Sequence, residues 1–316
     1  METQYEGYFS KLNAVIAELC ELSEKRHVVF FVEKQAALVI QKLSRHDVEK
    51  VLSGKKALRQ SAYFIKFSTT YKLNYEDELN TYWSTVPFYT EWHVKYLLIY
   101  LNIAKPGAFD SRNGVITATL HIGNEKKIKK KEFPMFANVI HLSLDLLNEY
   151  KWPPVKELKI ADTLEWIDKH WNAFTTTPKN RIQRALNAFS YLFHDSLSDN
   201  SPSDLFFSLL GIEALFVDGN ENVQKQVDIK SQILLGKRTE FKRKFNELYE
   251  FRSRYIHGQL NFVNKYYIHD AERDVKEHIF KTYDNSNLAI LILTASIQRH
   301  MLLNRDELEF EFTLKN

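Results

Sequence analysis

The stretch Leu248-Tyr249-Glu250-Phe251-Arg252-Ser253-Arg254-Tyr255-Ile256-His257-Gly258 closes a predicted helix and indicates what the C-terminal half of the chain can be. Four residues separate Arg252 from His257, and glycine follows the histidine directly. Such a pair can cleave RNA without a metal ion, because histidine moves protons near neutral pH and arginine stabilises charge on phosphorus. The spacing alone is weak evidence. With 13 Arg and 11 His in 316 residues, roughly one such match is expected by chance.

The position of Arg252 on its helix gives the spacing more weight. A helix over residues 241–256 places Arg252 at the centre of an apolar stripe, because successive residues advance by about 100°. An unpaired charge in apolar surroundings costs several kcal/mol, so Arg252 must meet a carboxylate or line a cleft that receives an anion. The apolar residues of the stripe are Phe241, Phe245, Leu248, Tyr255 and Ile256.

A second match to the spacing, Arg273 to His278, lies in a different setting. Residues 270–278 alternate acidic and basic side chains at helical spacing, which is typical of a solvated helix face. We therefore expect no catalytic role for the pair of Arg273 and His278.

The order and spacing of four segments are similar to those of one known family. They resemble the opening helix, acidic helix, connecting helix and signature of the Apea-like branch of the HEPN superfamily (higher eukaryotes and prokaryotes nucleotide-binding). The resemblance covers about residues 175 to 304. Relatives often carry Asn or Asp where this chain has Ser253. The four segments are Arg181–Leu186, Ser208–Phe216, Val227–Gly236 and Leu248–Gly258, the last with its Leu248-Tyr249, Arg252-Ser253 and His257-Gly258 pairs.

This resemblance implies a fold, an activity and a set of partners. The fold is a small α-helical bundle that dimerises and brings two Arg/His pairs into one cleft. The activity is metal-independent endoribonuclease cleavage without a cofactor, and the implied catalytic residues are Arg252, His257, Glu213 and Ser253. Many relatives act in antiviral defence, in abortive infection or as toxins. Some domains of the superfamily bind nucleotides without cutting RNA.

Glu213 lies on an otherwise apolar face of a helix predicted over residues 204–217. In one interpretation its carboxylate pairs with an arginine only to satisfy a packed helix, and in the other it orients Arg252 or His257. Both interpretations place Glu213 near Arg252. Leu205, Leu209, Ile212 and Phe216 form one apolar row of this helix, and Phe206, Leu210, Glu213 and Val217 form the next row.

Three other features have alternative interpretations that the sequence leaves open. His257 and Gly258 could simply cap a helix, the imidazole through the helix dipole and the glycine in a left-handed conformation. The basic run Lys126–Lys131 could contact phosphate or keep a hairpin edge soluble. Basic residues also outnumber acidic ones in residues 236–255, which could form a phosphate-guiding rim or an ordinary charged surface.

Composition narrows the class of protein. The 43 basic and 40 acidic residues are too nearly balanced to indicate nucleic-acid binding from net charge alone. Cys20 is the only cysteine, so we expect no internal disulfide and no cysteine-based zinc site, as suits the reducing cytoplasm. The N-terminus lacks an export signal, and the longest apolar run, Tyr96–Ile103, is too short to span a membrane. We therefore expect a cytoplasmic protein without metal or cofactor.

The predicted fold class is mainly α, with an α+β N-terminal domain over residues 1–154 that could act as a sensor or regulatory region. Residues 155–176 connect it to a HEPN-like helical domain over residues 177–304, and residues 305–316 form a tail. The junction is placed at Pro153-Pro154, because successive prolines lack backbone donors and disfavour helix before them.

Local patterns predict individual elements within these domains. Apolar spacing predicts a helix over residues 8–24, aromatic residues favour strands or mixed structure over 61–90, and alternation predicts a strand over 114–123. Residues 92–104 could form a buried helix or strand. In the C-terminal half, one helix is expected to start with Thr177 as N-cap and Pro178 as its first residue, and the last to run over residues 285–304.

The predicted reaction is attack of a ribose 2′-hydroxyl on the adjacent phosphate, with His257 moving protons and Arg252 stabilising the charge on phosphorus. A second histidine from a symmetry mate, or Glu213, would complete the acid and base pair, so we expect a homodimer. The expected partners are an RNA substrate, with tRNA as one candidate, and a phage-derived or cellular activator. The alternative is a non-catalytic HEPN module that binds a nucleotide or a protein and regulates another activity.

Overall fold

The chain falls into two compact units in a computed structural model. Unit 1 comprises Met1–Val94 and Val115–Phe133, and unit 2 comprises Lys95–Gly114 and Pro134–Asn316. The structure describes residues 28–30, 36–42, 65–70, 91, 95–107, 113–122, 125–134, 140, 143–144, 146–147, 151–171, 177–193, 202–238, 242–260 and 273–310. The helix expected over residues 8–24 and most of the aromatic stretch 61–90 lie outside these ranges.

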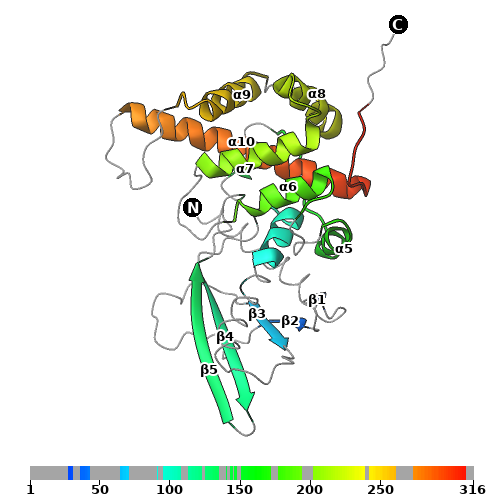
Figure 1. The fold of residues 1–316 in the computed structure, drawn as a ribbon, viewed down its shortest axis with the longest axis vertical. Helices are drawn as coiled ribbons and strands as arrows, with labels where there is room; N and C mark the ends of the chain where they lie inside the picture. Colours follow the sequence, from blue (N-terminus) through cyan, green and yellow to red (C-terminus); the bar gives the residue numbers. More distant parts are fainter. Residues whose placement is uncertain are drawn as a thin grey trace. The chain divides into compact units, whose positions relative to one another are not determined.

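The described strands lie in unit 1 or at its borders (Figure 1). Strands β1 (Val28–Phe30), β2 (Ala36–Lys42) and β3 (Ile65–Thr70) form an antiparallel sheet in the order β1-β2-β3. Strands β4 (Asn113–Ile122) and β5 (Glu125–Pro134) pair with each other. The strand expected over residues 114–123 coincides with β4, and the basic run Lys126–Lys131 lies in β5.

Unit 2 is helical in its described part, so the expectation of a mainly α fold is confirmed (Figure 1). Residues 95–104 form a buried helix rather than a strand. None of the helices that the structure describes is long and apolar enough to cross a membrane. The later helices are α5 (Ile160–His170), α6 (Arg181–Ser190), α7 (Pro202–Phe216), α8 (Val223–Leu235), α9 (Lys242–Ile256) and α10 (Arg273–Leu303).

Helix α10 provides the centre of the core, because its residues 289–293 are completely buried. It packs against α6, α7, α8 and α9, and α7 also packs against α6. At the crossing of α7 and α10, a Cβ on Gly211 would lie 2.8 Å from Leu293 Cδ1. Only a glycine lets the two helices approach this closely without moving Leu293. This contact fixes the height of α7, on which Glu213 follows two residues later.

Two helix starts differ from the sequence expectation. Helix α6 begins at Arg181, because the side chain of Asn180 accepts a hydrogen bond from the backbone N–H of Gln183 and caps the helix there. Thr177 and Pro178 therefore precede the helix. Helix α10 begins at Arg273 rather than at residue 285, since its first turns are largely exposed and carry little of the apolar spacing that marks a helix in the sequence.

The proline pair follows a tryptophan that packs into unit 2. Trp152 is buried, and its indole N–H donates a hydrogen bond to the carbonyl of Gly236, 3.1 Å away. The guanidinium of Arg238 lies over the same indole ring, 5.1 Å from its centre. The segment that was expected to be a junction between domains is therefore attached to the turn between α8 and α9.

A buried glutamine links three parts of unit 2. The side-chain amide of Gln298, on α10, donates to the carbonyls of Ile103 and Lys156 at 2.7 and 2.6 Å. Its side-chain oxygen accepts from the backbone N–H of Lys156 at 2.9 Å. With Gln298 only 1% exposed, these hydrogen bonds are shielded from water and hold α10 to residues 95–104 and to the segment before α5.

Candidate functional site

Helix α9 ends in a Schellman cap that fixes the position of His257. Gly258 has φ of +65°, and its N–H donates to the carbonyl of Tyr255 at 3.2 Å. The N–H of Gln259 donates to the carbonyl of Arg254 at 2.8 Å, which completes the motif. No atom lies within 4 Å of a Cβ built on Gly258, so the glycine is needed for its conformation and not for space. The capping role expected of Gly258 is confirmed, and the side chain of His257 is exposed.

Arg252 and Glu213 form a two-pronged ion pair between α9 and α7. Arg252 Nε donates to Glu213 Oε1 at 3.0 Å, and Arg252 Nη2 donates to Glu213 Oε2 at 2.9 Å. The two side chains are 22% and 21% exposed. Parallel bonds of this kind orient a guanidinium as well as neutralise it. The expectation that Arg252 meets a carboxylate, and that Glu213 lies near it, is confirmed.

The surroundings of this ion pair are less buried than the apolar rows suggested. Leu205, Leu209, Ile212 and Phe216 form the buried row of α7, as expected. On the row of Glu213, however, Phe206 and Leu210 are 42% and 48% exposed. On α9, Ile256 lies one turn beyond Arg252 and is 48% exposed, so it does not belong to the buried stripe. The end of α9 extends beyond the helices that cover its earlier turns.

Tyr249 is the buried neighbour of the ion pair that sequence reasoning missed. It is 4% exposed, and desolvation raises the pKa of its hydroxyl well above the ordinary value. The charge of Glu213 raises the same pKa further, while Arg252 and Arg238 oppose the shift. Within the described ranges the Tyr249 hydroxyl has no hydrogen-bond partner. Its position three residues before Arg252 was the available signal, because residues at that spacing share a helix face.

The structure does not bring His257 together with Arg252 in a single chain. Five residues at about 100° each place the two side chains about 140° apart around α9. Among the described residues, no hydrogen bond or ion pair joins His257 to Arg252 or Glu213. Ser253 is also exposed, on the side of α9 between them. His257 instead shares a row with Arg254, which lies one turn before it.

The basic residues before and along α9 do not form one phosphate-guiding rim. Arg238 is buried, hydrogen-bonded to Asp228 and stacked 3.9 Å from the ring centre of Phe245. Burial lowers the pKa of Arg238 to about 10, so it remains charged at neutral pH. Arg243 and Lys244 share Glu247, at 2.9 and 3.5 Å. By contrast, Arg254 is exposed and forms no ion pair with another residue of the described ranges.

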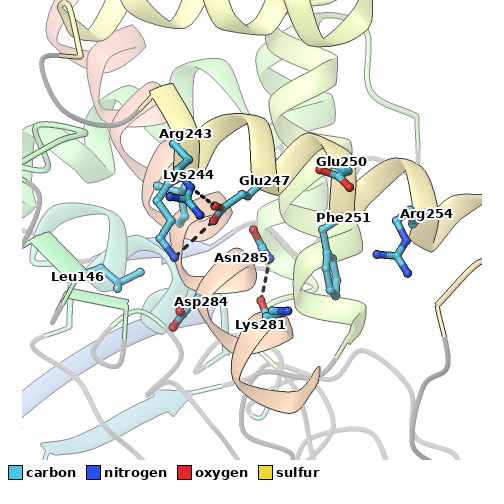
Figure 2. A pocket seen from close by; sticks show the side chains of 11 residues that line it. Leu146, Arg243, Lys244, Glu247, Glu250, Phe251, Arg254, Lys281, Asp284 and Asn285 are labelled. Carbon is cyan, nitrogen blue, oxygen red and sulfur yellow. Dashed lines mark hydrogen bonds and ion pairs between the residues drawn. The ribbon is translucent and has the colours of Figure 1, made fainter. Parts of the chain in front are cut away.

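A groove of about 430 Å³ runs between α9 and α10, on the side of α9 away from Glu213 (Figure 2). We call it the α9–α10 groove. His278 lies beside it, with its ring 5.9 Å from that of Phe251. Desolvation lowers the pKa of His278, and the charges of Arg254 and Lys281 lower it further. The segment 270–278 is therefore not simply a solvated face, because His278 is partly buried. The cationic side chains that line the groove are Arg243, Lys244, Arg254 and Lys281, and Phe251 and Leu288 contribute apolar surface.

The described ranges contain no group of three or more His, Cys, Asp or Glu side chains placed to hold a metal ion. No family model matches the sequence, and neither a curated protein nor a solved structure matches it. The assignment of a function therefore depends on the residues and geometry of α7, α9 and α10.

Proposed function

We propose that the chain is a metal-independent endoribonuclease of the HEPN type. The observation that supports this proposal is the end of α9, where the Schellman cap presents His257 to solvent one turn from an exposed arginine. A histidine of this kind can transfer protons at neutral pH, and Arg252, held by Glu213, has a fixed orientation for stabilising charge on a phosphate.

The reaction is an internal transesterification. The 2′-hydroxyl gives its proton to a base as its oxygen attacks the neighbouring phosphorus. The bond from phosphorus to the 5′-oxygen then breaks, and that oxygen takes a proton from an acid. The products carry a 2′,3′-cyclic phosphate and a 5′-hydroxyl, and no redox change or added cofactor is needed. His257 serves as one of the two proton-transfer groups, while Arg252 stabilises the developing negative charge.

The second proton-transfer group comes from a second copy of the chain. Because His257 and Arg252 face different sides of α9, a complete set of groups requires a two-fold dimer in which one protomer's histidine approaches its partner's arginine. The exposed apolar residues Phe206, Leu210 and Ile256 lie on the helix rows of Glu213 and Arg252, where such a partner would bury them. In this arrangement Ser253 lines the same side of α9 as part of the site.

The biological role consistent with this reaction is an antiviral defence or toxin effector that acts on cellular RNA, with tRNA as a candidate substrate. The α+β region before the HEPN-like bundle would sense a phage-derived or cellular activator. The proposed setting is the cytoplasm.

A second candidate is a non-catalytic HEPN module that binds a nucleotide or a protein and regulates another activity. The favouring observation is the separation of the two key side chains. In one chain, two guanidinium nitrogens of Arg252 are engaged by Glu213, and His257 lies on another side of the helix.

One cleavage experiment distinguishes the two candidates. Purified protein is incubated with total cellular RNA in excess EDTA, and the product termini are assayed. We expect cyclic phosphate ends from the wild type and no cutting by His257→Ala or by the double variant Arg252→Gln with Glu213→Gln, which leaves no unpaired charge. Arg299→Ala removes an exposed arginine of α10 and serves as the control. Cutting that persists without His257 would exclude the proposed site, and no cutting by any protein would favour the regulatory module.

A further inference from the structure

The two ends of the α9–α10 groove differ in charge. At one end Arg243 and Lys244 are both within ion-pair distance of Glu247, so their charges are largely compensated. At the other end lie Arg254 and Lys281. Lys281 pairs with Glu277 at 2.9 Å, but both side chains are more than half exposed, and a surface pair of this kind is worth little and exchanges readily. An anionic ligand would therefore be attracted to the end with Arg254.

The lowered pKa of His278 independently indicates positive potential at this end of the groove. After desolvation, the causes of the shift are the charges of Arg254 on α9 and Lys281 on α10. Two cations from facing helices therefore act on one point. A phosphate group placed between them would contact both, since each helix contributes one donor.

The wall beside Arg254 is aromatic. In Figure 2 the ring of Phe251 extends from α9 toward α10, with Arg254 one turn further along α9. An aromatic face next to cationic donors is the combination by which proteins bind single-stranded nucleic acid, because bases stack on the ring while the backbone meets the cations. The groove volume of about 430 Å³ lies within the range of roughly 300–1,000 Å³ that small-molecule sites occupy, which is enough for one nucleotide.

The groove also points toward His257. Glu250, Arg254 and His257 follow each other at spacings of four and three residues, so they share one row of α9. Three residues of helix advance by about 4.5 Å, so the backbone of His257 lies about one turn beyond Arg254. A strand whose phosphate is bound at Arg254 can therefore continue directly to His257. Arg252, by contrast, faces α7.

We infer that the α9–α10 groove holds the nucleotide next to the cleaved bond of a single-stranded RNA, with Arg254 and Lys281 binding its phosphate and Phe251 contacting its base. This inference rests on the proposed function, for which it names the substrate-binding surface. Arg254 binds substrate here and takes no part in proton transfer.

The test measures binding separately from cleavage. The probe is a short, fluorescently labelled single-stranded oligouridine with 2′-O-methyl riboses, which cannot be cleaved by 2′-hydroxyl attack. Its affinity for the full-length protein is measured over a range of salt concentrations for the wild type, Arg254→Gln, Lys281→Gln and the control Arg243→Gln. Arg243 lines the same groove, is 91% exposed and belongs to the compensated end.

We expect Arg254→Gln and Lys281→Gln each to weaken binding several-fold at low salt and to reduce the salt dependence by about 0.7 in log–log slope, the value for one single-strand phosphate contact. Arg243→Gln should bind like the wild type. Equal binding by all four proteins, no binding by the wild type, or competition by uridine monophosphate as effective as by the unlabelled oligonucleotide would each overturn the inference.

The two proposals can fail separately. If His257→Ala abolishes cleavage but Arg254→Gln binds and cleaves like the wild type, the nuclease stands and the groove assignment is wrong. If no RNA is cut but Arg254→Gln and Lys281→Gln lose affinity for the probe, the groove binds RNA in a protein that is not a nuclease.

Discussion

Replacing Glu213 with glutamine tests whether the ion pair with Arg252 is a structural element of the site. The substitution preserves the shape of the side chain but removes its charge and at least one of two hydrogen bonds to Arg252, at 3.0 and 2.9 Å. Breaking a fully buried pair costs about 3–5 kcal/mol, and breaking an exposed one costs about 0–1 kcal/mol. With both side chains about one-fifth exposed, we expect a loss of about 2 kcal/mol in the free energy of unfolding.

The loss is measured by urea denaturation followed by far-ultraviolet circular dichroism. Glu247→Gln is the matched control, because its partner Arg243 is 91% exposed and the pair should contribute less than about 0.5 kcal/mol. A double-mutant cycle with Arg252→Gln should give a coupling energy of about 1–2 kcal/mol. If Glu213→Gln costs no more than Glu247→Gln, the pair is solvent-screened and Glu213 does not fix the orientation of Arg252.

Four further substitutions test other parts of the structure. Gln298→Leu removes three buried hydrogen bonds and should cost about 3 kcal/mol in the free energy of unfolding, whereas a loss below about 1 kcal/mol would contradict the linking role. Gly258→Ala places a Cβ on a residue with φ of +65° and should cost about 1 kcal/mol in thermal or chemical denaturation. Burial lowers the pKa of His300, so the unfolded chain takes up the proton first. Stability should therefore fall as the pH drops below about 6.5, should be unaffected by this group at higher pH, and should show a smaller pH slope in His300→Gln. Tyr249→Phe removes a buried hydroxyl without a partner in the described ranges and should change stability by less than about 0.5 kcal/mol, while a loss above about 1 kcal/mol would show that the hydroxyl is hydrogen-bonded.

The helices of the C-terminal half were predictable where apolar spacing is regular. Leu205, Leu209 and Ile212 mark the buried row of α7, and the helix lies where they predicted it. The start of α10 was missed because its first turns carry exposed charged residues, and a helix supported from only one side leaves a weak pattern. The start of α6 was misplaced because proline at a first helical position is only a preference, and the Asn180 cap is stronger here.

The candidate site was predictable in part. A charge in an apolar stripe and an acid on another apolar helix must find each other, and this reasoning identified the contact between Arg252 and Glu213. The side of α9 that His257 faces follows from the same helical geometry, yet spacing in the sequence suggests proximity where the helix provides separation. The burial of Arg238 could not be predicted, because one of its aromatic neighbours, Trp152, is far away in the chain.

The glutamine that ties α10 to the helix of residues 95–104 has a mechanical consequence. From Lys281 to Gln298 the backbone of α10 is continuous helix, a rod of about 26 Å at 1.5 Å per residue. Gln298 holds one point of this rod, and Lys281 forms part of the groove wall at another. A displacement of residues 95–104 that carries Gln298 with it would therefore change the width of the groove without any intervening loop, as a lever moves its far arm.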